Sequence, residues 1–169
     1  PRADPLVIAH TLNQIGLCRL EGPYRVETAE PFFREAIATA QAHSSQSSPD
    51  ELEHLCYYQV NLAMTLNRQR DLAESKELLT DVLKQSTQLS GEPFAEVKDY
   101  ALQHLSVRHR LANELDKAID ASLERRELHA LDADELCRIA AEFADCAARS
   151  SPEHASVERS AKLHEQSVQ

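Results

Sequence analysis

Apolar side chains recur every three or four residues along most of the chain, which is the period of helices with one face turned toward a core. The run Phe33, Ala36, Ile37 and Ala40 is a clear example of this spacing. Strands would instead alternate apolar and polar residues, and no segment keeps a period of two over a convincing length. The pattern therefore predicts an all-α protein.

Helix start and stop signals divide this pattern into eight helices of similar length. Asp, Ser and Thr side chains accept hydrogen bonds from the free N–H groups of a first turn, and proline fits there without loss. The expected helices cover about residues 5–21, 28–43, 49–68, 71–91, 92–113, 113–130, 132–150 and 151–168. Short connections between them predict that consecutive helices pack as antiparallel hairpins.

Several helix starts carry specific capping signals. The predicted capping residues are Asp4, Thr28, Ser48, Asn113 and Asp132. Ser48 and Asp132 are each followed three residues later by glutamate, which is the spacing of a capping box. Asn113 stands where the fifth helix is expected to end, so it is predicted both to close that helix and to cap the next one.

The eight helices pair into copies of one two-helix repeat, in which each helix carries a small residue among larger ones. The small residues are Gly16, Ala63, Ser106 and Ala144 on the first helices and Ala29, Ser75 and Ala118 on the second helices. The fourth copy has the weakest pattern, with Ala140, Phe143, Ala144 and Ala147 followed by Val157 and Ala161. Small side chains let paired helices approach closely while larger neighbours fill the gap. These residues are therefore predicted to lie buried between helices.

The segment Leu12-x2-Ile15-Gly16-x2-Arg19, followed by Ala29-x3-Phe33-x2-Ala36, resembles the two-helix pattern of the tetratricopeptide repeat (TPR) family. The resemblance covers residues 5–130 well. It implies a right-handed α-solenoid of four helical hairpins, in a single domain spanning residues 1–169. The implied repeats are residues 5–43, 49–90, 92–130 and 132–168.

These repeats are longer than the standard TPR unit. Their corresponding second-helix positions recur at intervals of 46, 43 and 39 residues, whereas the standard repeat has about 34. The helices are therefore expected to be longer than usual. Repeats of about 40 to 47 residues are typical of HEAT and armadillo proteins, which form the architectural alternative.

The composition limits the classes of binding partner and the cellular compartment that we expect for this protein. The net charge of −10 disfavours polyanions, so no nucleic-acid partner and no membrane partner is expected. The four cysteines form no C-x-x-C pair, no signal peptide is visible, and no apolar run is long enough to span a membrane. We therefore expect a soluble, cytoplasmic protein. Because the chain opens with Pro1 and stops within a helical pattern, we expect it to be part of a longer protein.

The first helices of stacked hairpins line a concave groove in which a partner can bind. The groove residues predicted from this placement are Asn13, Gln14, Tyr57, Asn61, Met64, Arg68, Tyr100, His104 and Arg110. The TPR resemblance implies that Asn61 hydrogen-bonds a bound peptide backbone, since an amide both donates and accepts. Arg68 and Arg110 are expected to make the groove locally positive, which suits an acidic or C-terminal segment. The plainer interpretation is that these residues are solvated on an exposed helix face.

The sequence offers little for catalysis, metal binding or cofactors. It contains no G-x-S-x-G, no phosphate-binding G-x-x-x-x-G-K, and no H-E-x-x-H or H-x3-H spacing. We therefore expect neither an enzyme nor a metal or cofactor site. Cys137 and Cys146 lie nine positions apart, on nearly one helical face, and are expected to be buried free thiols.

These observations favour a protein–protein interaction module that binds a peptide or helical segment of a partner in its concave groove. The alternative is a ligand- or peptide-sensing regulatory domain of a larger regulator, which requires a closed and mostly apolar pocket for a small molecule. A third possibility is a structural scaffold whose ends stack on other repeats or on a second copy of the chain.

Overall fold

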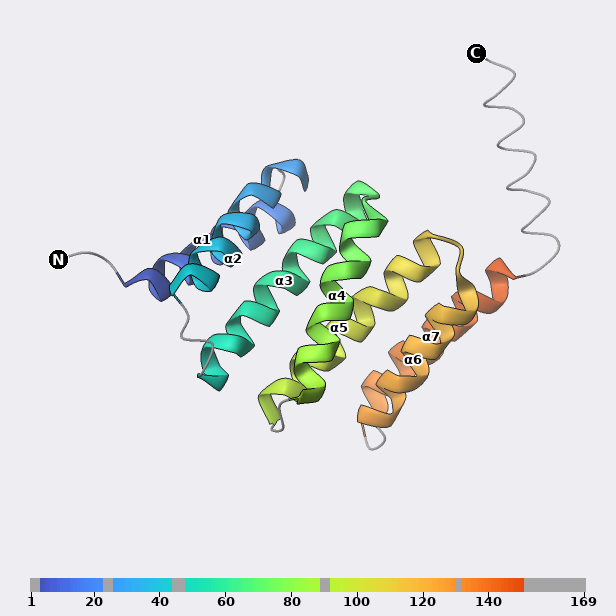
Figure 1. Ribbon diagram of the computed structural model, residues 1–169. Coiled ribbons are helices and arrows are strands. Elements are labelled where there is room, and N and C mark those ends of the chain that lie inside the picture. Colours follow the sequence, from blue (N-terminus) through green and yellow to red (C-terminus); the bar gives the residue numbers. More distant parts are fainter. Residues whose placement is uncertain (1–3, 23–25, 44–47, 89–91, 130–131, 151–169) are drawn as a thin grey trace, which may run out of the picture.

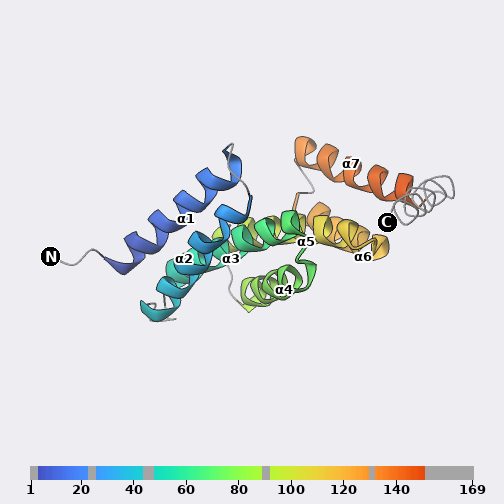
Figure 2. The same ribbon diagram turned by 90° about the horizontal axis from the view of Figure 1, so that it is seen from above.

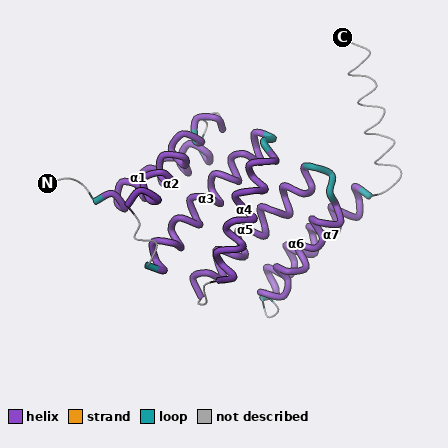
Figure 3. The backbone as a smooth tube through the Cα atoms, in the orientation of Figure 1, coloured by secondary structure: helices purple, strands orange, loops and turns teal. Residues whose placement is uncertain are grey.

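The computed structural model describes residues 4–22, 26–43, 48–88, 92–129 and 132–150. Within these ranges the chain is helical and contains no strand, as Figure 3 shows. The elements are α1 (Pro5–Glu21), the 3-10 turn η1 (Val26–Thr28), α2 (Glu30–His43), α3 (Pro49–Gln69), α4 (Leu72–Gln88), α5 (Glu92–Leu111), α6 (Leu115–Leu128) and α7 (Ala133–Arg149) (Figure 1). The all-α prediction is confirmed. The described residues hold seven α-helices rather than eight, because the helix predicted from Ser151 onward lies outside them.

Each α-helix packs against the next one in the sequence, and α3 also contacts α1 and α5. The helices lie side by side from α1 and α2 at one end to α6 and α7 at the other (Figure 1). Seen from above, α1 and α7 stand on one side at the two ends, with α3 and α5 between them and α4 on the opposite side (Figure 2). None of the described helices is long and apolar enough to cross a membrane.

The first and last described helices begin at the predicted capping residues. The Asp4 carboxylate accepts a hydrogen bond from the Leu6 backbone N–H at 2.9 Å, directly before Pro5. The Asp132 carboxylate accepts hydrogen bonds from the N–H groups of Asp134 and Glu135, both at 3.0 Å. Each carboxylate therefore satisfies backbone donors that have no partner within the helix.

Of the three other capping predictions, one holds in position and two are wrong. Ser48 is the N-cap of α3 and Pro49 opens the helix, but the Ser48 side chain makes no capping hydrogen bond. Thr28 ends the 3-10 turn η1, and α2 begins two residues later at Glu30. Asn113 has a left-handed backbone with φ 58°, and Glu114 rather than Asn113 precedes the first residue of α6. A residue held in the left-handed region to close α5 cannot also take the extended backbone of a helix N-cap.

The turns after α3 and α5 are built alike. Arg70 and Asn113 lie 43 positions apart, and both have a positive φ, 68° and 58°. The next residue in each turn donates its N–H to a carbonyl five residues back, with Asp71 bound to Leu66 at 2.9 Å and Glu114 bound to His109 at 2.8 Å. This 6→1 hydrogen bond is the mark of a Schellman motif, which satisfies a carbonyl left free at the helix end.

The small residues of the first three predicted repeats are buried between paired helices, as expected. At Gly16, an added Cβ atom would lie 2.6 Å from Cε1 of Phe33, closer than carbon atoms pack. Ser75 sits against α3 and donates its hydroxyl to the Ala63 carbonyl at 3.2 Å and to Oδ1 of Asn67 at 2.8 Å. The backbones of paired helices can approach this closely because no larger side chain separates them.

In the fourth predicted repeat the expected buried face of α7 is wrong, and the predicted second-helix residues Val157 and Ala161 lie outside the described residues. α7 buries Ile139, Glu142 and Cys146. The predicted packing residues Ala140, Ala144 and Ala147 are exposed, Phe143 is half-buried, and Cys137 is exposed instead of buried. The face that α7 turns inward carries Glu142, which bonds to α6, and apolar spacing alone does not reveal that contact.

We predict that Gly16→Leu lowers the free energy of unfolding by about 1 to 3 kcal/mol, because the new side chain cannot fit beside Phe33 without moving α1 from α2. Urea unfolding followed by circular dichroism measures the change. Gln14→Leu adds the same side chain at an exposed position of α1 and serves as the control. Equal stability of the two variants would contradict the close approach at Gly16.

Candidate functional site

Four of the predicted groove residues meet in one patch on α3 and α5. The rings of Tyr57 and Tyr100 have centroids 6.5 Å apart, and Tyr100 meets His104 edge to face at 4.8 Å. The Tyr100 hydroxyl also reaches Sδ of Met64 at 4.0 Å. We call the surface formed by these four residues and Arg68 the inner face.

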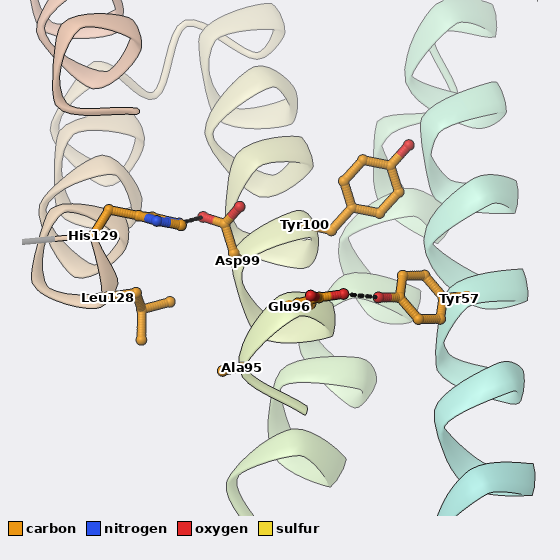
Figure 4. A pocket seen from close by; sticks show the side chains of 7 residues that line it. All are labelled: Tyr57, Ala95, Glu96, Asp99, Tyr100, Leu128 and His129. Carbon is orange, nitrogen blue, oxygen red and sulfur yellow. Dashed lines mark hydrogen bonds and ion pairs between the residues drawn. The ribbon is translucent and has the colours of Figure 1, made fainter. Parts of the chain in front are cut away.

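Two hollows of similar size flank this patch. The tyrosine hollow has a volume of about 460 Å³ and lies between α3, α5 and the end of α6 (Figure 4). It is lined by Tyr57, Ala95, Glu96, Asp99, Tyr100, Leu128 and His129. The arginine hollow also measures about 460 Å³. It is lined by Met64, Asn67, Arg68, Arg70, His104, Val107 and Leu111.

The cations of the arginine hollow bind backbone carbonyls rather than carboxylates. Arg68 donates from Nη1 to the Leu20 carbonyl at 3.1 Å, near the end of α1. Arg70 donates from Nη1 to the Leu111 carbonyl, the last of α5, at 3.4 Å. Carbonyls at helix C-termini lack intrahelical partners and attract cations, so these contacts position both guanidinium groups. In the part of the chain that the structure describes, neither group pairs with a carboxylate.

Arg110 differs from Arg68 in its pairing. Its Nη1 lies 3.3 Å from Oδ2 of Asp145 on α7, which also pairs with Arg149. An ion pair of this kind compensates the Arg110 charge. The predicted positive character of the groove therefore rests on Arg68 and on Arg70, which was not among the predicted groove residues.

Asn13 and Asn61 bind each other instead of projecting into an open groove. Nδ2 of Asn61 donates to Oδ1 of Asn13 at 2.9 Å, and the two residues are only 5% and 4% exposed. This buried hydrogen bond joins α1 to α3. Gln14, the neighbour of Asn13, is exposed on α1. The expectation that Asn61 offers its amide to a peptide is therefore not met in this conformation.

His104 is a neutral member of the inner face. Burial, followed by the charges of Arg68 and Arg125, lowers its pKa to about 4. Its Nε2 atom is buried and has no hydrogen-bond partner among the described residues. The imidazole therefore adds a polar atom, but no positive charge, at neutral pH.

The tyrosine hollow carries carboxylates instead of guanidinium groups. The Tyr57 hydroxyl donates to Oε2 of Glu96 at 3.2 Å, and burial together with this carboxylate raises the Tyr57 pKa to about 12. Oδ1 of Asp99 accepts a hydrogen bond from Nε of Arg125 at 2.9 Å. Nε2 of His129 lies 2.9 Å from the same oxygen, without the alignment of a hydrogen bond (Figure 4).

Behind this hollow lies a buried charge cluster that the sequence analysis missed. Arg125 is fully buried and contacts three carboxylates, those of Asp99, Glu135 at 3.4 Å and Glu142 at 2.7 Å. Glu142 also accepts hydrogen bonds from hydroxyl groups of α5 and α6. One signal was available, because Arg125 stands seven positions after Ala118 and therefore on the same buried helix face.

The described residues contain no group of three or more His, Cys, Asp or Glu side chains arranged to hold a metal ion. A scan against protein-family models found no match for the chain, and searches of curated proteins and of solved structures found none either. The function therefore has to be inferred from the chemistry of the inner face.

We predict that Asn61→Ala costs about 1 to 3 kcal/mol of folding free energy, because it leaves the buried Oδ1 of Asn13 without a donor. Urea unfolding of Asn61→Ala, Asn13→Ala and the double variant measures the coupling between the two amides. The double variant should lose clearly less than the sum of the single losses. Strictly additive losses would show that the hydrogen bond does not form.

We predict that His104 makes the fold less stable as the pH falls. The folded pKa is about 4 against 6.5 for an unperturbed imidazole, so between these values the unfolded chain binds more protons than the folded chain. For each protein, the free energy of unfolding at pH 7 and pH 4 is compared with its value at pH 8. The decrease should be smaller for His104→Gln than for the wild-type chain, because glutamine does not bind the proton. Urea unfolding at the three pH values tests this, and an NMR titration midpoint near 6.5 for His104 would contradict it.

Proposed function

We propose that the chain is a TPR-like interaction module that binds an extended peptide segment of a partner protein on its inner face. The observation that carries the proposal is the continuous patch of Tyr57, Tyr100, His104 and Met64, with a hollow at either end. Tyrosine and methionine are enriched in protein interfaces, because their side chains offer large contact areas.

The patch is held in place before any partner arrives. Its side chains project from two helices that pack on each other and on α4. Tyr100 touches Tyr57, His104 and Met64, so its ring is already positioned. Binding to such a surface costs little ordering of side chains, which leaves more of the contact energy for affinity.

The dimensions fit a short extended segment. The residues that line the two hollows lie about ten positions apart on both α3 and α5, which corresponds to about 15 Å along a helix. An extended chain covers this distance in about four to five residues. One peptide can therefore contact the tyrosine hollow, the aromatic patch and the arginine hollow together.

A ligand-sensing regulatory domain is the alternative proposal. It is supported by the volume of the tyrosine hollow, about 460 Å³, which lies in the range of small-molecule sites. Glu96, Asp99 and His129 are the polar members of a lining that is otherwise aromatic or apolar. The peptide proposal uses both hollows, whereas the sensor proposal leaves the arginine hollow without a role.

The remaining proposals concern partners and place. We propose a cytoplasmic, non-enzymatic module with no nucleic-acid or membrane partner, in keeping with the net charge of −10. Stacking on a second copy, or on further repeats, would use the exposed apolar residues Val7, Ile8 and Ile15 of α1, which are 59%, 40% and 37% exposed. We also propose that the helical hairpins stack as a right-handed solenoid.

We predict that the chain enriches binders from a phage-displayed library of random peptides of about 12 residues, long enough to span both hollows. Tyr100→Ala should raise the Kd of the selected peptides about tenfold, since central aromatic residues dominate interface energies. Fluorescence polarisation with labelled synthetic peptides measures the Kd.

Glu77→Ala and Lys84→Ala are the matched controls, because both side chains are exposed on α4, away from the inner face. They should leave the Kd unchanged. If the α4 variants weaken binding and Tyr100→Ala does not, the binding surface lies on the outer helices and the proposed function of the inner face is wrong.

A further inference from the structure

The tyrosine hollow has acceptor oxygens in excess of donors. Both contacts of Asp99 use Oδ1, and the one contact of Glu96 uses Oε2. Within the described part of the chain, Oδ2 of Asp99 and Oε1 of Glu96 therefore have no partner. The two carboxylates stand between the rings of Tyr57 and Tyr100 on one side and the end of α6 on the other (Figure 4).

The charge behind the hollow does not neutralise these groups. Arg125 divides one positive charge among Asp99, Glu135 and Glu142. Among the described residues two further groups pair with these carboxylates. Arg138 reaches Glu135 alone and its side chain is 68% exposed, and the His129 imidazole lies against Oδ1 of Asp99. Carboxylates therefore outnumber the compensating cations at this end of the inner face, whereas the arginine hollow at the other end is cationic.

We propose that the tyrosine hollow receives a lysine or arginine side chain of the bound peptide, an inference that rests on the proposed peptide-binding function. The cationic head would donate to Glu96 and Asp99 and lie beside the tyrosine rings, which attract cations through their π faces. Its alkyl stem would pack on Leu128 and Ala95, two apolar members of the lining.

The position of the arginine hollow then sets the spacing of the recognised segment. An acidic residue of the same peptide pairs with Arg68 or Arg70 while the basic residue occupies the tyrosine hollow. The separation of about 15 Å between the hollows places the two residues about four to five positions apart in an extended chain. The recognised partner is therefore a segment with a basic and an acidic residue at that spacing, bound in one direction.

A double-mutant cycle on a selected phage peptide tests the inference. The peptide is synthesised with its enriched lysine or arginine and again with norleucine at that position, which keeps the stem and removes the charge. Both peptides are titrated against the wild-type chain, Glu96→Gln and the control Glu77→Gln. Glu96 is exposed and, among the described residues, bonds only to Tyr57, so its replacement leaves the core intact.

Replacing the charged peptide by the norleucine peptide should raise the Kd about tenfold for the wild-type chain and for Glu77→Gln. For Glu96→Gln the same replacement should raise the Kd less than about threefold. Glu96→Lys should reverse the preference, so that norleucine binds at least as well as the charged peptide. Selected peptides should carry Lys or Arg about four to five positions from Asp or Glu.

The outcomes separate this inference from the proposed function. The inference is wrong if the selected peptides depend on Tyr100 but carry no enriched basic residue. It is also wrong if the norleucine replacement has the same effect on the Kd in the wild-type chain and in Glu96→Gln. Either result leaves the proposed peptide binding on the inner face intact. Peptides insensitive to Tyr100→Ala, or no enriched peptides at all, overturn the proposed function and this inference with it.

Discussion

The close approach of paired helices at their small residues is the constraint on which the rest of the structure depends. Ala63 lies in one buried cluster with Leu79 and Val82 of α4, and Ser75 of the same helix donates to the Ala63 carbonyl. Each step along an α-helix turns the side chain by about 100°, so this contact also fixes the direction of Met64 beside it. The corresponding small residue of α5, Ser106, is buried in the same way. The side chains of the inner face are therefore oriented by the packing of α3 and α5 against their paired helices.

Much of the fold could be predicted because its determinants are local. Proline, capping carboxylates and the period of apolar residues placed the helix starts to within a few residues, and the small residues gave the packing of the first three pairs. The buried face predicted for α7, the first helix of the fourth pair, is wrong for a physical reason, and the second helix of that pair lies outside the described residues. α7 docks through Glu142, a charged residue that periodicity assigns to solvent, and so the buried face of α7 is rotated away from its alanines.

The candidate site was predictable only in part, for a similar reason. Tyr57, Met64, Tyr100 and His104 share one face of their helices, which helical spacing reveals. The pairing of Asn61 with Asn13 depends on the approach of α1 to α3, and the pairing of Arg110 with Asp145 depends on the position of α7. Whether a polar side chain is available to a partner depends on its contacts with segments that are distant in the sequence. A single sequence does not directly reveal such contacts.

The buried Arg125 also has a consequence for how α7 is aligned. Apolar side chains such as Ile139 tolerate a small slide of one helix along another, since many positions give similar contact. A guanidinium group shared by Asp99, Glu135 and Glu142 does not, because sliding α7 would strand buried charges without partners. A change in the length of the α6–α7 connection would therefore separate Arg125 from Glu135 and Glu142, and removing α7 would leave this buried guanidinium group with Asp99 alone among its three carboxylates.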